Sequence, residues 1–187
     1  MDAFMFTLLL TFIIALGGRD QMIIAQFSDE LERTTGLLLV GMACAAASAA
    51  AMAYAGWTIA AMLPTRAANM LVAIALAFAG LELFWRVKLK PMKEPTRSYV
   101  AIGVVIFLRQ FGDAARFVVF AFAAQAVYPV LTIAGGALGG MAAIALGWAV
   151  GKNTLDRYPL FLGRLFFGGC LLVAALFLGL NARFAVM

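Results

Sequence analysis

The chain has 187 residues, of which 65% are hydrophobic and 12% charged, and its mean hydropathy is +1.01. A soluble domain carries about a quarter charged residues, so this composition predicts an all-α integral membrane protein. The absence of histidine excludes Ser-His-Asp and Cys-His enzymes. We assign the net charge of +5 to loops retained in the cytoplasm. Nucleic acid is not expected as a partner, because the sequence has no basic stripe interleaved with aromatic residues.

Six segments are apolar over the roughly 20 residues that a membrane-spanning helix needs. They cover residues 3–27, 36–56, 69–87, 100–126, 131–150 and 160–181. The first segment lacks a basic region before it and a small-residue cleavage site after a short apolar core, so we expect it to be a membrane helix, not a cleaved signal. The sequence therefore predicts six transmembrane helices in the lipid bilayer.

Lysine and arginine are concentrated on one side of this predicted arrangement. The side that holds the connections after the first, third and fifth segments carries Arg33, Arg86, Lys88, Lys90, Lys93, Arg97, Lys152, Arg157 and Arg164. The other side carries only Arg66 and Arg183. The positive-inside rule places the basic side in the cytoplasm, and both termini are then external. We expect a multi-pass protein of the bacterial inner membrane.

An internal repeat becomes visible when the sequence is shifted by 95 residues, which places Thr11–Phe27 over Ile106–Phe122. Both stretches read as an apolar run, glycine, a charged cluster and a second apolar run. We interpret residues 1–87 and 100–187 as three-helix repeats joined by a basic cytoplasmic linker at 88–99. Because each half has an odd number of helices, the halves are expected to be inverted, as in many secondary transporters.

Charged residues inside the predicted helices are the main functional signal. They are Arg19, Asp20, Glu82, Arg109, Asp113 and Arg116. Such residues usually face the bundle interior or a wet cavity. Glu82 lies four residues before Arg86, and the expected explanation is an i,i+4 ion pair. The others lie in the two repeated segments beside Gly17, Gly18 and Gly112, where a helix break would free backbone carbonyls to bind a cation.

Neutral residues of the same segments add to this pattern. Gln21, Gln26, Gln110 and Gln125 lie on the same two predicted helices as the charges. Four glycines of the fifth segment form two overlapping GxxxG spacings: Gly135, Gly136, Gly139 and Gly140. These spacings predict close helix packing, within the chain or in a homodimer. Cys44 and Cys170 are interpreted as small core residues.

The two glycine-centred segments resemble a motif of the form Glu-x-Gly-Asp-Lys/Arg-Thr/Ser that opens each half of the GDT-one family. This family is also called uncharacterised protein family 0016 and belongs to the LysE-type transporter superfamily. The second motif, RQFGDAARF, has Gly112 and Asp113 in place, with Gln110 at the glutamate position. The first, ALGGRDQ, keeps Gly17 and Arg19. The resemblance covers nearly the whole chain and implies a cation transporter that exchanges manganese or calcium for protons.

The resemblance also suggests which residues form the site. The predicted substrate-binding residues are Asp20, Asp113, Gln21, Gln110, Arg19 and Arg116. We expect Asp20 and Asp113 to bind the metal, since a hard divalent cation prefers carboxylate oxygens, with the two glutamines as further oxygen donors. The metal is the substrate and no cofactor is predicted. Alternating access would come from rocking of one half against the other.

Two other functions remain open from the sequence. In the first, the intramembrane arginines bind an anion or the carboxylate of an amino acid. In the second, the protein is a non-transporting membrane scaffold, in which Arg19 pairs with Asp113 and Asp20 with Arg116. An enzyme is not expected, because no nucleophile–base or two-carboxylate arrangement stands out.

Overall fold

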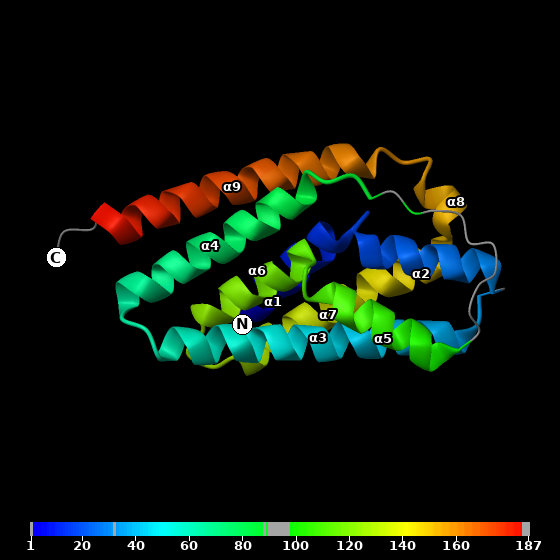
Figure 1. The fold of residues 1–187 in the computed structure, drawn as a ribbon, viewed down its shortest axis with the longest axis horizontal. Helices are drawn as coiled ribbons and strands as arrows, with labels where there is room; N and C mark the ends of the chain where they lie inside the picture. Colours follow the sequence, from blue (N-terminus) through cyan, green and yellow to red (C-terminus); the bar gives the residue numbers. More distant parts are fainter. Residues whose placement is uncertain (1, 32, 88, 90–97, 185–187) are drawn as a thin grey trace.

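The computed structural model describes residues 2–31, 33–87, 89 and 98–184, and no strand occurs among them. Its helices are α1 (Asp2–Ala15), α2 (Arg19–Glu30), α3 (Thr35–Ala61), α4 (Thr65–Leu83), α5 (Tyr99–Gln110), α6 (Ala114–Ala124), α7 (Val130–Val150), α8 (Lys152–Leu155) and α9 (Leu160–Phe184) (Figure 1). The all-α prediction is confirmed for these residues. Most of the predicted basic linker, 88–99, lies outside them.

The lengths of the helices support a multi-pass membrane protein. Helices α3, α4, α7 and α9 are each long and apolar enough to cross a membrane. Helices α1 and α2 together pass the same test, but they meet at an angle of 60°. Helices α5 and α6 are apolar but short. Among the described residues there are therefore four to five candidate spans. The segments 3–27 and 100–126, each expected as one membrane helix with a possible break at its glycines, are each divided into two helices.

Local backbone chemistry explains why these two segments break. Gly17 adopts a φ of 67°, in the left-handed region that glycine enters without strain, and Gly18 then caps α2 in an extended conformation. In the second segment Asp113 is the N-cap of α6, and its carboxylate accepts a hydrogen bond from the Ala115 N–H at 3.3 Å. Each break therefore occurs at the glycine-containing cluster common to both halves of the sequence.

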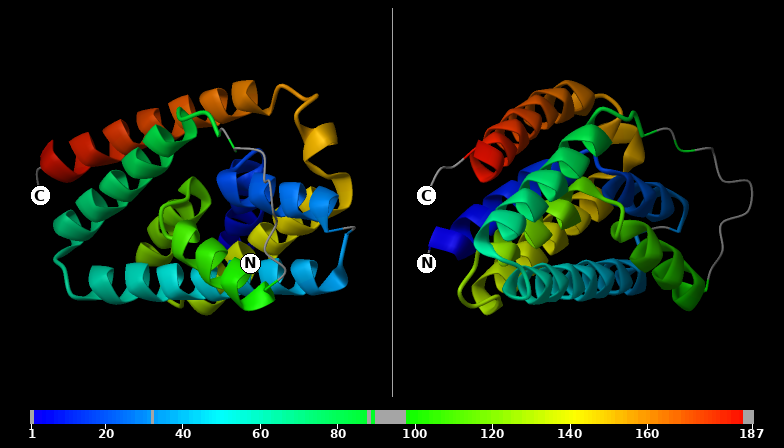
Figure 2. Two further views of the ribbon diagram at one scale, coloured as in Figure 1. Left: turned by 45° about the vertical axis from the view of Figure 1, so that its right-hand side comes forward. Right: turned by 60° about the vertical axis from the view of Figure 1, so that its left-hand side comes forward.

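Helix boundaries recur along the chain with the spacing of the sequence repeat. The first residues of matching helices lie 95 positions apart: Arg19 and Ala114, Thr35 and Val130, and Thr65 and Leu160. Contacts between helices show the same repeat, because a contact between two helices recurs between the matching helices of the opposite halves. Helix α3 packs against α6 while α7 packs against α2, and α1 packs against α7 while α5 packs against α3. Helices α4 and α9 pack side by side on the outside of this group (Figure 2).

The glycines of α7 allow neighbouring backbones to approach closely. A Cβ atom on Gly135 would lie 2.5 Å from the carbonyl oxygen of Phe4, and one on Gly139 would lie 2.5 Å from that of Leu8, both in α1. Gly136 on the next face contacts Val119 of α6. The predicted close packing at the GxxxG spacings is thus confirmed within the chain, whereas a homodimer stays a prediction.

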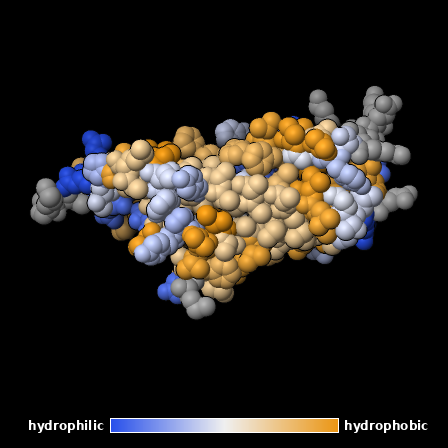
Figure 3. All heavy atoms as spheres, turned by 90° about the horizontal axis from the view of Figure 1, so that it is seen from below, coloured by the Kyte–Doolittle hydropathy of each residue, from blue (hydrophilic) through white to orange (hydrophobic). Residues whose placement is uncertain are grey.

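Large apolar side chains cover much of the outer surface. On α9 they include Leu162, Phe166, Val173 and Phe177, each more than 60% exposed. Apolar residues fill much of the face seen in Figure 3, with hydrophilic residues gathered toward its ends. Such a surface is suited to lipid contact. Cys170 is exposed on α9, so its prediction as a core residue was wrong, and Cys44 is half-buried.

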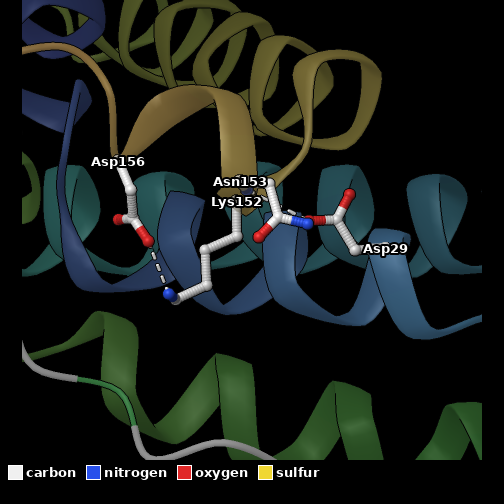
Figure 4. A network of polar contacts seen from close by, with 4 residues as sticks. All are labelled: Asp29, Lys152, Asn153 and Asp156. Atoms are coloured by element: carbon white, nitrogen blue, oxygen red, sulfur yellow. Dashed lines mark hydrogen bonds and ion pairs between the residues drawn. The ribbon is translucent and has the colours of Figure 1, made fainter.

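The short helix α8 holds the end of α7 against α2. Asp29 of α2 accepts a hydrogen bond from the backbone N–H of Asn153 at 3.2 Å, and so it caps α8 from another helix (Figure 4). Lys152 and Asp156 form an ion pair of 2.6 Å along α8. Gly151, at the junction with α7, has a φ of 78°. Helix α8 has no counterpart in the first half of the chain.

Candidate functional site

The two helix breaks meet at a small internal pocket, here called the central pocket. It is lined by Gly18, Asp20, Gln21, Gln110, Asp113 and Arg116, together with residues of α1 and α7. Five of the six residues predicted to bind substrate are therefore brought together. The sixth, Arg19, is exposed, and Arg109 of the same predicted cluster is exposed as well. Gln26 and Gln125 do not line this pocket.

Two carboxylates enter the central pocket from different halves of the chain. Asp20 lies in the first turn of α2 and is 7% exposed, and Asp113 caps α6 and is 8% exposed. Both lie at helix N-termini, whose partial positive charge favours a carboxylate. Across the residues that the structure describes, no lysine or arginine nitrogen lies within 4.0 Å of either one. The ion pairs expected for a scaffold, Arg19 with Asp113 and Asp20 with Arg116, are not formed.

Arg116 is positioned by neutral groups. Its Nε donates a hydrogen bond to Ser48 Oγ at 2.6 Å, and Ser48 donates to Gln110 Oε1 at 2.6 Å. A Cβ atom on Gly140 would lie 3.0 Å from Arg116 Nη1, so α7 is kept free of side-chain bulk beside the guanidinium. Sequence reasoning missed Ser48, whose only signal is a lone hydroxyl within an alanine-rich run.

The contact that Gln21 of the first half makes is equivalent to the contact of Arg116 of the second half with Ser48. Its Nε2 donates to the Ala143 carbonyl at 2.9 Å, and its Oε1 accepts the Gly17 N–H at 2.7 Å. Arg116 lies 95 residues after Gln21, and Ala143 lies 95 residues after Ser48. Each half therefore sends one side chain from the start of α2 or α6 to the same position on the long helix of the other half.

Gln110 contributes an unused donor to the central pocket. It is completely buried, and its Nε2 has no hydrogen-bond partner in the structure. Buried amide groups are nearly always paired with protein or water, so an unpaired one beside two carboxylates marks a place for water or a polar ligand.

Glu82 forms an ion pair with a residue of another helix. Arg164 of α9 donates from Nη2 to Glu82 Oε2 of α4 at 2.9 Å. The expected partner, Arg86, instead lies 4.5 Å above the centre of the Phe161 ring. The i,i+4 prediction was therefore wrong. Sequence reasoning counted Arg164 only as a residue flanking the membrane, and its position against Glu82 depends on the packing of α4 on α9.

A second, larger cavity of about 470 Å³ lies next to α8, and we call it the α8 cavity. The first helix break, α2, the segment after α4, α8 and α9 all contribute to its lining, which includes Gly17, Met22, Val87, Leu155 and Arg164. Gly17 thus faces the α8 cavity while the adjacent Gly18 faces the central pocket. The break between helices α1 and α2 therefore lies between the α8 cavity and the central pocket.

Metal-ligating side chains are sparse. Across the described part of the chain, no group of three or more His, Cys, Asp or Glu side chains has a metal-like arrangement. A cation in the central pocket would therefore have Asp20 and Asp113 as its charged ligands. The amide oxygens of Gln21 and Gln110, expected as further donors to the cation, already accept hydrogen bonds from the Gly17 N–H and from Ser48. Comparison with known proteins adds nothing to this set: no family model, curated protein or solved structure matches the chain.

Proposed function

We propose that this protein is a secondary transporter that exchanges a cation for protons at the central pocket. The observation that carries the proposal is the pair Asp20 and Asp113, which enter one buried pocket from the two helix breaks without an arginine in contact. Intramembrane acids of this kind are typical of ion pathways. The resemblance to the GDT-one family supports Mn²⁺ or Ca²⁺ as the cation.

The chemistry of exchange follows from the cost of burying charge. A carboxylate removed from water is costly unless a counter-charge or a proton neutralises it. Asp20 and Asp113 can meet this need with a bound cation or with protons, so the two ligands compete for the same oxygens. Arg116 offsets one negative charge, which keeps a bound cation from being held too tightly to leave. Two acids against one arginine also favour a cation over an anion in this pocket.

The proposed architecture is an inverted repeat of two three-helix halves with six membrane crossings. Two of the crossings are broken helices, α1–α2 and α5–α6, whose breaks meet at the site, as in transporters with discontinuous helices. The 95-residue spacing of helix boundaries and the matching contacts of Gln21 and Arg116 support this proposal. The lysine and arginine distribution supports an α8 end in the cytoplasm and external termini.

Alternating access is supported by a difference between the halves. Helix α4 packs along α6, whereas the matching helices α9 and α2 make at most marginal contact and the α8 cavity lies between them. In the opposite state of the transporter each half would adopt the packing that the other half has here. The gap between α2 and α9 would then close while α4 separates from α6. The central pocket would then be approached from the opposite side.

The test is cation flux in proteoliposomes that hold purified protein, with dyes for the cation and for internal pH. We expect the wild type to move Mn²⁺ or Ca²⁺ inward with proton movement outward. Asp20→Asn and Asp113→Asn each remove one charged ligand and should reduce flux at least about tenfold, because a neutral amide cannot replace a charged ligand for a divalent ion. Glu30→Gln, an exposed acid at the other end of α2, should leave flux unchanged.

Equal flux in wild type and Asp113→Asn would exclude the central pocket as the transport site. Uptake of Mn²⁺ or Ca²⁺ without any proton movement would exclude exchange while leaving a cation path. Melting temperatures of all variants should be measured in the same preparation, so that loss of flux is not confused with loss of fold.

A further inference from the structure

Arg164 is a buried cation with unused hydrogen-bonding capacity. It is only 4% exposed, and of its three nitrogens Nη2 alone is paired, with Glu82. Nε and Nη1 are both buried and have no partner. A guanidinium carries five N–H donors and no acceptor, so these nitrogens call for oxygen acceptors that the surrounding protein does not supply. Arg164 is also one of the residues that line the α8 cavity.

The surroundings of Arg164 favour an anion. A Cβ atom on Gly18 would lie 3.5 Å from Arg164 Nη1, so the guanidinium lies against the N-terminus of α2. Gly18 caps that 12-residue helix without any side-chain hydrogen bond. Helix N-termini with free N–H groups attract anions. Arg86 lines the same cavity, while the acid in its lining, Asp156, is paired with Lys152.

We propose that the α8 cavity binds a small oxyanion, a carboxylate or a phosphate, through the free nitrogens of Arg164. Arg86 and the N-terminus of α2 would supply further positive potential. The cavity volume of about 470 Å³ is within the range of small-molecule sites. The two sites share only the N-terminus of α2: the anion would be bound by Arg164 and Arg86, which do not line the central pocket, so the inference goes beyond the proposed function and does not depend on it.

The anion site can be tested without the transported cation and without a proton gradient. The melting temperature of the full-length protein in detergent is measured at constant ionic strength while sodium chloride is replaced by sodium phosphate or by sodium acetate. A ligand that binds only the folded state raises the melting temperature with the logarithm of its concentration above the Kd, and we expect a rise of about 3 °C at roughly ten times the Kd. The phosphate and acetate arms separate the two ligand types, and isothermal titration calorimetry gives the affinity of the stronger one.

Paired variants assign the effect to Arg164. Arg164→Gln combined with Glu82→Gln removes both members of the ion pair, so no unpaired charge remains, and should abolish the rise. Arg164→Lys keeps the charge but loses the planar donors, and should weaken affinity at least about tenfold even if the double variant fails to fold. Arg183→Gln removes an exposed arginine from the same helix and should leave the rise intact.

The proposal is overturned if neither phosphate nor acetate differs from chloride. It is equally overturned if the rise persists in the double variant, or if Arg164→Lys binds as tightly as the wild type. A loss of cation flux in the Asp20 or Asp113 variants, by contrast, has no bearing on this site.

Discussion

Ser48 is the only hydroxyl that joins the polar groups of the central pocket within the described chain. It accepts from Arg116 and donates to Gln110, and it is completely buried. Through it, α3 of the first half holds two side chains of the second half. The orientation of the Arg116 guanidinium therefore depends on a buried serine of the other half.

Replacing Ser48 with alanine should cost about 1–3 kcal/mol of unfolding free energy, because Arg116 Nε and Gln110 Oε1 would both lose a buried partner. Equilibrium unfolding in detergent measures this change. Thr58→Ala on the same helix is the control: that hydroxyl bonds only to carbonyls of its own helix, and its loss should stay within about 0.5 kcal/mol. Equal effects of the two substitutions would mean that Ser48 does not organise the pocket.

Residue chemistry was only partly predictable from the sequence. Asp20, Asp113 and Arg116 could be found because a charge within an apolar run is conspicuous by itself. Ser48 and the pairing of Arg164 with Glu82 could not, because both depend on which helices lie side by side. Arg19 shows the opposite error: its charge is as conspicuous as that of Asp20, but its position on α2 turns it outward.

At the scale of elements, the long helices were predicted more accurately than the broken ones. The predicted segments 36–56, 131–150 and 160–181 begin within one residue of α3, α7 and α9. For the segments 3–27 and 100–126 the glycines indicated a possible break, but the sequence could not decide between one helix and two, because a hydrophobicity pattern does not report the backbone angle at Gly17 or the capping by Asp113. Tertiary contacts decide whether a glycine bends a helix or lies within it.

Packing of α1 on α7 provides a test at this scale. Gly139→Ala would place a methyl group against the backbone of α1, near Leu8 O, and only a shift of a whole helix can relieve the contact. We expect a loss of about 1–3 kcal/mol in unfolding free energy. The control is Gly169→Ala in α9, where a Cβ meets nothing within 4 Å and the higher helix propensity of alanine should stabilise by up to about 1 kcal/mol.

Opposite signs for the two substitutions are the decisive result, since both make the same chemical change within a long apolar helix. A neutral or stabilising Gly139→Ala would mean that α1 does not approach α7 as closely as the structure has it. The GxxxG spacing would then be free for contact with a second copy of the chain.

The whole molecule combines matching halves with unequal packing. Met22 of α2 lines the α8 cavity, whereas Phe117, which lies 95 residues later on α6, stacks on Phe78 of α4 with ring centres 5.8 Å apart. These two positions are equivalent in the repeat but differ in their surroundings: Met22, although only 8% exposed, lines a cavity, and Phe117 is half-buried against α4. The hydrophobicity of the sequence predicts both helices and their spacing. It does not predict which of the two is covered, because that depends on the state of the whole bundle.

Cysteine labelling at these two positions tests whether the halves exchange roles. In a background of Cys44→Ala and Cys170→Ala, Met22→Cys should react with a water-soluble maleimide from the α8 cavity, and Phe117→Cys should react more slowly, because its position packs against Phe78 of α4. Saturating Mn²⁺ or Ca²⁺ on the opposite side should shift the population and reverse the ratio, since a ligand stabilises the state that binds it. The size of the shift reports the difference in affinity between the two states.

The outcome separates a transporter from a static bundle with an unequal shape. If reactivity at both positions is unaffected by cation, proton gradient and the Asp113→Asn substitution, the gap between α2 and α9 is a fixed feature and alternating access is excluded. If position 22 alone responds, the motion is confined to the first half. Reciprocal changes at positions 22 and 117 require movement of the two halves together, which is the behaviour that an inverted repeat permits.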